Sequence, residues 1–217
     1  MKFPINPADL GEYQRIAEDA GFSLCVGVDE AGRGPLAGPV TAAAVHLPSG
    51  IELPGLNDSK QVKESERERL YDILIGSDEI LCSVVNVSSE RIDEINVLQA
   101  THEAMRAAVA GLPKVPDLVL VDGNPVTGFL CPAINVIKGD AKSAAIAAAS
   151  ILAKVSRDRI MLAYADEYPE YGFEKHKGYG TKMHLQALRE YGACPIHRQT
   201  FAPIKALAVD AKQGRLF

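Results

Sequence analysis

The stretch Leu24-Cys-Val-Gly-Val-Asp-Glu-Ala-Gly-Arg-Gly34 is the starting point for interpreting this chain. Residues 24–28 form a short apolar run typical of a buried strand, and two adjacent carboxylates, Asp29 and Glu30, end it. Neighbouring strand side chains point to opposite faces, so both acids serve one site only if the strand end bends or the site straddles its edge. The glycines at 32 and 34 would permit a bend. The pattern indicates divalent-metal binding by the acids beside a turn that grips a nucleic-acid strand; two solvated acids in a surface hairpin are the alternative.

Length and composition are those of a globular protein. The chain has 217 residues, of which 47% are apolar and 24% charged. We expect a single domain over residues 1–217, with a core at about 1–170 and a helical C-terminal region at about 171–217. Apolar runs are shorter than the roughly 18 residues that a membrane span needs. The N-terminus also lacks the apolar segment of a secretory signal, so we expect no membrane association.

Cysteine usage favours a reducing compartment. The four cysteines are widely scattered and show no CxxC spacing, which argues against a zinc site. We therefore expect reduced, buried thiols and a cytoplasmic location. These residues are Cys25, Cys82, Cys131 and Cys194.

The net charge of −5 is unevenly distributed along the chain. Residues 1–137 carry 10 Lys and Arg against 20 Asp and Glu, a net −10, whereas residues 138–217 carry 13 against 8, a net +5. An acidic part and a basic part suit a protein that binds metal with one and phosphates with the other. Two ordinary solvated surfaces would give the same distribution.

Apolar periodicity and turn residues divide the chain into strands and helices. After an N-terminal helix, the predicted order is strand, strand, helix, strand, helix, strand, strand, helix, with a small helical C-terminal appendage. This order is typical of an α/β or α+β layered domain with a mixed sheet, whose first two strands pair as an antiparallel hairpin. The expected strands cover 23–29, 39–47, 80–87, 117–122 and 132–137; the expected helices cover 7–21, 63–76, 89–110, 141–166 and 182–191; a Lys, Gly and aromatic loop covers 173–181, and a tail follows Gly192.

Two further acids follow predicted strands. Asp122 ends the apolar run 117–122, and Asp140 stands at the mouth of the alanine-rich helix. Sites in open α/β sheets gather beyond the carboxyl ends of the strands, where four carboxylates together would repel one another. Magnesium or manganese would relieve that repulsion, since hard cations prefer oxygen ligands. Taken singly, Asp140 could instead cap the helix, and Asp122 could be a turn residue.

Such ions suit in-line displacement at phosphorus, with lysines and arginines holding the phosphate backbone. Ordinary solvated surface is the alternative for each of these cations. The candidates are Arg33, Lys60, Lys138, Lys142, Lys175 and Lys177.

Several motifs together make the sequence resemble ribonuclease HII, the bacterial type 2 ribonuclease H. The resemblance covers about residues 23–205, in the family's order and spacing. The matching segments are Val28-Asp-Glu-Ala-Gly-Arg-Gly-Pro-Leu-Ala-Gly-Pro39, Asn57-Asp-Ser-Lys60, Val121-Asp-Gly123, Lys138-Gly-Asp140, Ala149-Ser-Ile-Leu-Ala-Lys-Val155 with Arg157-Asp158, His176-Lys-Gly-Tyr179, and Pro195-Ile-His-Arg198 with Phe201 and Pro203.

The resemblance implies a ribonuclease H-like fold and a metal-dependent endonuclease that acts on RNA–DNA hybrids and on duplex DNA containing ribonucleotides. It implies cleavage on the 5′ side of a ribonucleotide, leaving a 3′-hydroxyl and a 5′-phosphate. By resemblance, Asp29, Glu30, Asp122 and Asp140 are the catalytic carboxylates. Gly32, Arg33 and Gly34 match a motif whose backbone recognises the 2′-hydroxyl, and Tyr179 matches a tyrosine that stacks on the following sugar. Asp158, well inside a helix, is assigned to structure, with an ion pair as its expected contact.

Two other interpretations remain open at this point. One is a non-catalytic module that binds RNA–DNA hybrids, although a binder gains nothing from carboxylates that face phosphate. The other is a different phosphoryl-transfer nuclease of the same fold, which the Gly-Arg-Gly turn and Tyr179 disfavour. Finally, Gln213-Gly-Arg-Leu-Phe217 resembles peptides that bind the bacterial sliding clamp, with a frayed terminus as the alternative. We expect a monomer.

Overall fold

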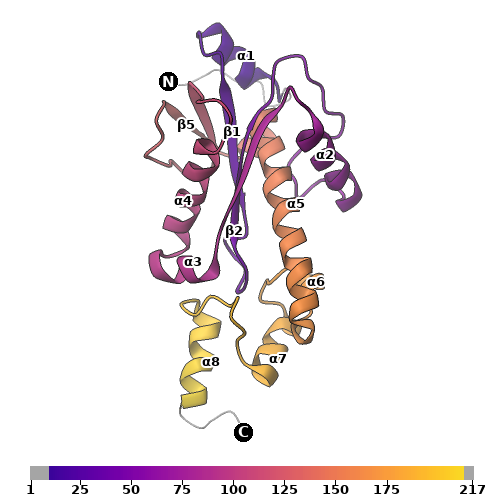
Figure 1. Cartoon of the computed structure of the whole chain (residues 1–217), viewed down its shortest axis with the longest axis vertical. Helices are drawn as coiled ribbons and strands as arrows, with labels where there is room; N and C mark the ends of the chain where they lie inside the picture. Colours follow the sequence, from indigo (N-terminus) through magenta and orange to yellow (C-terminus); the bar gives the residue numbers. More distant parts are fainter. Residues whose placement is uncertain (1–9, 213–217) are drawn as a thin grey trace.

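A five-stranded mixed sheet lies at the centre of the computed structural model, which describes residues 10–212 (Figure 1). The strand order is β3-β2-β1-β4-β5, in which β1 is antiparallel to β2 and parallel to β4. The predicted hairpin and mixed sheet are therefore confirmed. The strands are β1 (Cys25–Ala31), β2 (Val40–His46), β3 (Leu81–Val87), β4 (Leu118–Asp122) and β5 (Ala133–Val136).

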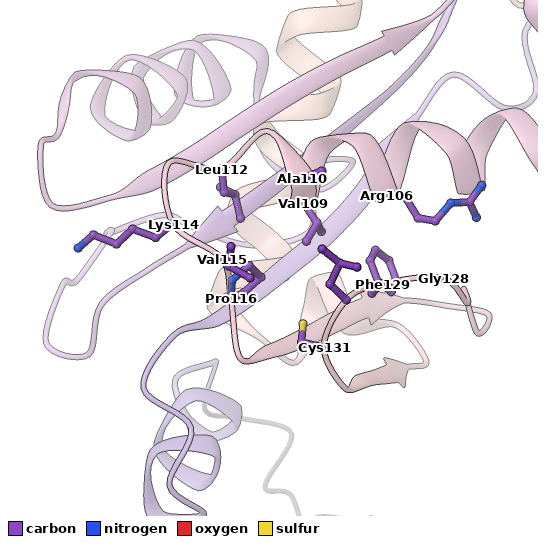
Figure 2. A pocket seen from close by; sticks show the side chains of 11 residues that line it. Arg106, Val109, Ala110, Leu112, Lys114, Val115, Pro116, Gly128, Phe129 and Cys131 are labelled. Carbon is purple, nitrogen blue, oxygen red and sulfur yellow. The ribbon is translucent and has the colours of Figure 1, made fainter.

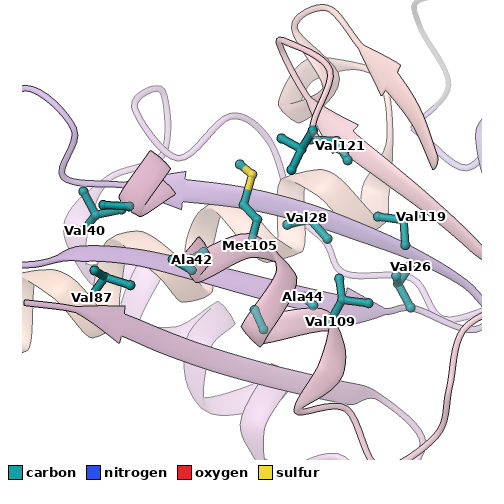
Figure 3. Close-up of a cluster of buried hydrophobic side chains, with 14 of the residues drawn as sticks. Val26, Val28, Val40, Ala42, Ala44, Val87, Met105, Val109, Val119 and Val121 are labelled. Carbon is teal, nitrogen blue, oxygen red and sulfur yellow. The ribbon is translucent and has the colours of Figure 1, made fainter. Parts of the chain in front are cut away.

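Helices cover both faces of this sheet. Alternate side chains of β1 belong to different layers: Val26 and Val28 pack with α3 and α4 (Figure 3), whereas Gly27 faces α5. The second layer is completed by α2, whose Leu70 and Leu74 pack with the alanines of α5. The helices are α1 (Glu12–Asp19), α2 (Glu64–Gly76), α3 (Ser89–Ile95), α4 (Val97–Ala110), α5 (Ala144–Glu167), α6 (Phe173–His176), α7 (Lys182–Tyr191) and α8 (Ala202–Lys212), with 3₁₀ turns η1 (Gly139–Ala141) and η2 (Pro169–Tyr171).

The start of α5 lies unusually close to the middle of β1. A Cβ added at Gly27 would stand 2.2 Å from the backbone carbon of Ala145 and 2.3 Å from the nitrogen of Ile146. This contact places the first turns of α5 against the strand that carries Asp29. The glycine therefore sets the distance between the helix and the site acids.

We expect Gly27→Ala to lower the free energy of unfolding by about 3 kcal/mol, because α5 must move away from β1 to admit the methyl group. Urea unfolding followed by circular dichroism measures the effect. Gly76→Ala is the matched control: no atom lies within 4 Å of its added Cβ, so stability should not fall. Equal stability of Gly27→Ala and the wild type would contradict the close packing.

The chain after α5 forms a separate apolar cluster around aromatic rings. Tyr171 and Phe173 stack with their ring centroids 5.3 Å apart, and three buried histidines surround them. Burial lowers the pKa of His184 and of His197 to about 4, and it also lowers the pKa of His176. The three rings are therefore neutral at pH 7.

Acidification is expected to destabilise the protein between pH about 6.5 and about 4. In that window unfolded histidines bind protons while His184 and His197 do not, so the free energy of unfolding falls as the pH falls. One independent histidine whose pKa is about 6.5 in the unfolded chain and about 4 in the folded protein changes the free energy of unfolding by about 3 kcal/mol across this window. Urea unfolding at several pH values measures the slope, and a His184→Asn/His197→Gln variant should show a shallower one. An unchanged slope in that variant would contradict the lowered pKa values.

Some predicted boundaries were wrong. The helix expected over 89–110 is two helices, because Asn96 adopts a positive φ of 67° and its Oδ1 accepts from the amides of Leu98 and Gln99, which caps α4. The helix expected from 141 begins at Ala144 and is capped by Ser143, so Asp140 is not its cap. The expected loop 173–181 contains α6, and α8 lies in the expected tail.

Two composition-based expectations can be compared with the structure. All four cysteines lie within the described residues and are free thiols; Cys25 and Cys194 are buried as expected, whereas Cys82 and Cys131 are only partly buried. None of the helices in residues 10–212 combines the length and the apolar character that crossing a membrane requires.

Candidate functional site

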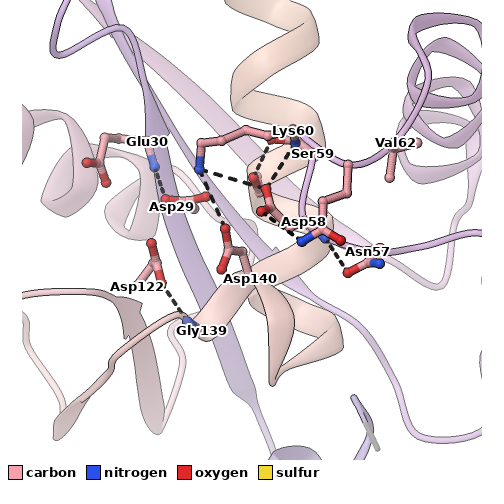
Figure 4. A network of polar contacts seen from close by, with 12 residues as sticks. Asp29, Glu30, Asn57, Asp58, Ser59, Lys60, Val62, Asp122, Gly139 and Asp140 are labelled. Carbon is pink, nitrogen blue, oxygen red and sulfur yellow. Dashed lines mark hydrogen bonds and ion pairs between the residues drawn. The ribbon is translucent and has the colours of Figure 1, made fainter. Parts of the chain in front are cut away.

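Three aspartates meet at the ends of the central strands (Figure 4). The last parallel pair of β1 and β4 is Val28 with Val121, so Asp29 and Asp122 follow side by side. Asp140 arrives from η1, and one carboxylate oxygen of each aspartate lies within 4.8 Å of the others. The amide of Gly139 donates to Asp122 Oδ1 at 2.6 Å and joins the two segments. Among residues 10–212, these three aspartates are the acids that lie close enough together to bind one metal ion.

Burial and mutual repulsion disfavour the ionised forms of these acids. The pKa of Asp29 is raised well above its ordinary value, first by burial and then by the charges of Glu30 and Asp122. Burial, followed by Asp122 and Asp58, raises the pKa of Asp140. Since one oxygen of each acid converges on a small volume, a divalent cation would relieve both costs.

The side chain of Glu30 leaves β1 on the opposite side from that of Asp29, but its carboxylate still contacts the carboxylate of Asp29. The strand continues to Ala31 and stays paired with β2, so neighbouring side chains keep their alternation and the site straddles the strand. Glu30 Oε1 accepts from Arg33 Nη1 at 3.1 Å. Burial raises the pKa of Glu30, while the arginine opposes that shift. Glu30 and Asp122 still line one cleft, so the fourth acid borders the cluster.

The segment 57–60 closes the site from the side of α5. Asp58 Oδ1 accepts from the amide of Lys60 at 2.9 Å, and Ser150 Oγ on α5 lies 2.8 Å from Ser59 Oγ. Ser150 also hydrogen-bonds the carboxylate of Asp29. Lys60 Nζ lies 3.7 Å from Asp140 Oδ2 and 3.8 Å from Asp58 Oδ1 (Figure 4), and its side chain is 79% exposed. An exposed cation tethered to the cluster can contact a substrate phosphate.

The cleft above the acids is bordered by the Gly-Arg-Gly turn and by Tyr179. It has a volume of about 320 Å³ and is lined by Gly32, Arg33 and Gly34 together with the acids Asp29, Glu30 and Asp122. Tyr179 is 48% exposed, and a Cβ at Gly34 would lie 3.6 Å from its ring. Five of the predicted substrate-binding residues therefore line one cleft: Gly32, Arg33, Gly34, Lys60 and Tyr179.

Two buried arginines hold the Gly-Arg-Gly turn from behind. Arg198 is 0% exposed and donates to the carbonyls of Gly32, Arg33, Gly38 and Pro39 at 2.6–3.1 Å. Arg157 is 1% exposed and donates to the carbonyls of Ala37, Pro39 and Lys177 at 2.9–3.0 Å. Neither guanidinium has a carboxylate partner within the described residues.

This arrangement orients the amides of the turn. The C=O and N–H of a trans peptide unit point in opposite directions, and no cis bond occurs in the described chain. Because Arg198 binds the carbonyls of Gly32 and Arg33, the amides of Arg33 and Gly34 point away from it, on the exposed side of the turn. Two backbone donors beside a carboxylate cluster suit recognition of a sugar hydroxyl or a phosphate oxygen.

Other predicted cations do not reach the cleft. Lys138, Lys142, Lys175 and Lys177 are absent from its lining, and Lys175 and Lys177 interact with Glu174 instead. Asp158 pairs with Lys154 Nζ at 2.7 Å, as expected for a structural residue. The predicted clamp-binding segment Gln213–Phe217 lies outside the described residues.

Sequence reasoning assigned no role in the cleft to five residues that line it or support it. Lys154 and Ser150 lie four residues apart on α5, a helical spacing that places both on the face toward the cleft. Ser59 belongs to the segment that closes the cleft, and all five residues were quoted only within motifs. Arg157 and Arg198 gave no local signal, because their partners are more than 100 residues away in the chain, except for Lys177.

A second recess is apolar and separate from the acids (Figure 2). It lies between the end of α4 and the segment 128–131, and its lining includes Val109, Leu112 and Phe129. Arg106 and Lys114 are the charged residues of its lining, and no carboxylate belongs to it. Hydrolytic chemistry therefore belongs to the acidic cleft.

Comparison with known proteins agrees with this geometry. The family model described as Ribonuclease HII matches residues 26–204. Ribonuclease HII of Endomicrobium trichonymphae is 53% identical over 206 residues, covering 94% of this chain and 98% of that protein. The Chlamydia muridarum ribonuclease HII is 54% identical over 209 residues, covering 94% and 96%.

Solved structures show the same fold. The ribonuclease H2 of Pyrococcus horikoshii superposes with a TM-score of 0.72 at 29% identity, covering 87% of this chain and 99% of that one. The ribonuclease HII of Archaeoglobus fulgidus, solved in complex with PCNA, gives 0.70 at 25% identity, covering 82% and 95%. The expected ribonuclease H-like fold is confirmed. The chain therefore belongs to the ribonuclease HII family and is an endoribonuclease of the ribonuclease H type.

Proposed function

We propose that this enzyme hydrolyses the RNA strand of RNA–DNA hybrids and cuts on the 5′ side of single ribonucleotides embedded in duplex DNA, leaving a 3′-hydroxyl and a 5′-phosphate. The observation that carries the proposal is the acidic cluster beside a turn with two exposed backbone donors. In the same cleft, the acids supply hydrolysis and the turn supplies recognition of the sugar.

The residues of the cluster fit divalent ions. Asp29, Asp122 and Asp140 offer converging carboxylate oxygens, and Glu30 borders them across the strand. An all-oxygen set favours Mg²⁺ or Mn²⁺ over zinc. When bound in the two-metal manner, the ions would lower the pKa of the attacking water and stabilise the leaving oxygen. The amide of Glu30 and the hydroxyl of Ser150 orient the carboxylate of Asp29.

Substrate choice is assigned to the turn and the tyrosine. The amides of Arg33 and Gly34 can reach a 2′-hydroxyl, the group that distinguishes RNA from DNA, without obstruction by side chains. Tyr179 presents a half-exposed ring that can pack on the sugar that follows the ribonucleotide. Arg33 and Lys60 line the same cleft and can hold neighbouring phosphates, whereas the structure gives Lys142 no such position.

Cleavage of end-labelled duplex DNA containing one ribonucleotide tests this proposal, with Mg²⁺ or Mn²⁺ and with EDTA. We expect one cut on the 5′ side of the ribonucleotide, cutting at many positions in a uniform hybrid, and none in all-DNA duplex. Ligation of the cleavage products identifies their ends, because a ligase joins only a 3′-hydroxyl to a 5′-phosphate. Binding without metal-dependent cleavage would favour the hybrid-binding module instead.

A sliding clamp is the second proposed partner, through Gln213–Phe217. The support is the tail's resemblance to clamp-binding peptides and the PCNA complex of the Archaeoglobus fulgidus relative. A pull-down with the bacterial clamp should retain the full chain and lose a chain cut after Lys212. Equal retention of both forms would refute the partner.

A further inference from the structure

Tyr179 is held through its backbone, while its ring stands in the cleft. Its amide donates to the carbonyl of His176 at 2.9 Å. Its carbonyl accepts from the amide of Thr181 at 2.8 Å and lies 3.0 Å from His184 Nδ1. His184 is 0% exposed and lies on α7. A buried imidazole therefore contacts the main chain of an exposed cleft residue.

The contacts of the buried histidines define their protonation. A carbonyl only accepts, so His184 Nδ1 must carry the proton that it donates to Tyr179. Since a neutral ring carries one proton, His184 Nε2 is an acceptor and receives the proton of His197 Nε2, 2.9 Å away. His197 Nδ1 then accepts from the amide of Cys194 at 3.0 Å. The hydrogen bonds thus run in one direction, from Cys194 to the Tyr179 carbonyl.

His176 supports the same loop from the other side. Its Nε2 donates to the carbonyl of Tyr171 at 2.9 Å, which leaves Nδ1 free to accept from the amide of Gly178 at 3.2 Å. Its ring also stacks on His184, with centroids 4.6 Å apart and planes at 16°. The amide of Gly178 and the carbonyl of Tyr179 are therefore both tied to this histidine pair.

An apolar side chain would fill these positions more simply. Three imidazoles that are 0–7% exposed must each satisfy two nitrogens, and every one of those nitrogens has a partner. Such a fully satisfied network specifies one geometry rather than adding much stability. Its last acceptor belongs to Tyr179, so the geometry that it specifies is that of the tyrosine loop.

We propose that His184, oriented by His197 and stacked on His176, is a positioning residue for Tyr179 that sets the preference for a ribonucleotide–deoxyribonucleotide junction over a uniform hybrid. The inference rests on the proposed function, in which the ring packs on the sugar after the ribonucleotide. At a junction that sugar is deoxyribose and fits the ring. In a uniform hybrid its 2′-hydroxyl weakens the packing, so the position of the ring matters less.

Steady-state cleavage of both substrates tests this role. We expect His184→Leu to lower kcat/KM for the single-ribonucleotide duplex roughly 10-fold, because one positioning hydrogen bond is lost, and for the uniform hybrid by roughly 2-fold or less. His184→Asn should restore most of the preference, since its amide can stand near the Nδ1 position. His184→Gln places its amide near the Nε2 position and not near Nδ1, so it should behave like the leucine variant. It replaces His184→Leu in the test if that variant does not fold.

The same substitutions in a Tyr179→Ala background separate positioning from general destabilisation. In that background His184→Leu should leave the ratio of the two kcat/KM values unchanged, because the tyrosine ring that His184 positions is absent. Leu188→Ala, a buried residue of the same cluster without a side-chain hydrogen bond, should lower both activities alike. An unchanged ratio in His184→Leu and His184→Gln, or a shift that persists without Tyr179, would overturn the inference. Failure of the wild type to cut the single-ribonucleotide duplex would instead refute the proposed function.

Discussion

Asp29→Asn is expected to reduce cleavage of a single-ribonucleotide duplex by roughly 10³-fold or more, because it removes a carboxylate oxygen at the centre of the cluster. The metal-free protein should nevertheless become more stable. Burial and the neighbouring acids raise the pKa of Asp29, so its ionised form is disfavoured in the folded state at pH 7, and the neutral amide relieves that cost. Loss of activity should therefore accompany a gain of stability.

Two measurements check this pair of effects. Gel assays of cleavage at saturating Mg²⁺ or Mn²⁺ give the rate, and thermal unfolding with and without the metal gives the stability. The wild type should be stabilised by the metal, while Asp29→Asn should respond weakly. Asp158→Asn is the control, because its partner is Lys154 and it stands outside the cluster. Activity of Asp29→Asn within a few-fold of the wild type would refute the assignment of the acids.

Local patterns in the sequence explain why the strands and acids could be predicted. The apolar run before Asp29 and the continuous run before Asp122 each bury a strand, and parallel pairing of β1 with β4 then brings the two aspartates together. The mixed sheet was predictable as well, because β1 and β2 form an antiparallel hairpin, whereas the helices between β3 and β4 let β4 pair in parallel with β1. The roles of the Gly-Arg-Gly turn and of Tyr179 came from family resemblance, whereas the candidate lysines came from charge alone. Lys142 shows the limit of the charge argument, since that lysine does not line the cleft.

Features that the apolar pattern does not encode, whether local or distant, were not predicted. Asn96 lies inside an apolar periodicity that suggested one helix, although Asn tolerates a positive φ and favours N-caps. From the sequence, Asp29 and Glu30 could serve one site either through a bend at the end of β1 or from the two faces of a straight strand. The pairing of β1 with β2, which continues through Ala31, decides for the straight strand. The buried arginines are polar residues in a core, for which sequence patterns give no partner.

Arg198→Met is expected to lower the free energy of unfolding by about 4 kcal/mol. It leaves the carbonyls of Gly32, Arg33 and Gly38 without this donor, while that of Pro39 keeps the hydrogen bond from Arg157, and each unsatisfied buried carbonyl costs about 1–3 kcal/mol. Burial, followed by repulsion from Arg157, lowers the pKa of Arg198 to about 9, so part of the loss is offset by removing a desolvated charge. Urea unfolding measures the balance.

Activity should fall further than stability explains. Without Arg198 the carbonyls of Gly32 and Arg33 can turn outward, and the amides of Arg33 and Gly34 then no longer face the substrate. We expect a loss of roughly 100-fold in kcat/KM at a temperature at which the variant is folded, which corresponds to two or more hydrogen bonds to the substrate. Arg198→Lys keeps the charge but cannot bridge four carbonyls, so it should be intermediate.

Leu70→Ala separates the two effects of this substitution. Leu70 is 0% exposed between α2 and α5, so its truncation should cost about 3 kcal/mol without touching the turn. If Arg198→Met and Leu70→Ala lost the same activity at matched stability, the arginine would be ordinary core. A much larger loss in Arg198→Met would mean that the buried cation acts through the turn: it draws the carbonyls inward and leaves the amides, on the positive side of each peptide unit, to meet an anionic strand.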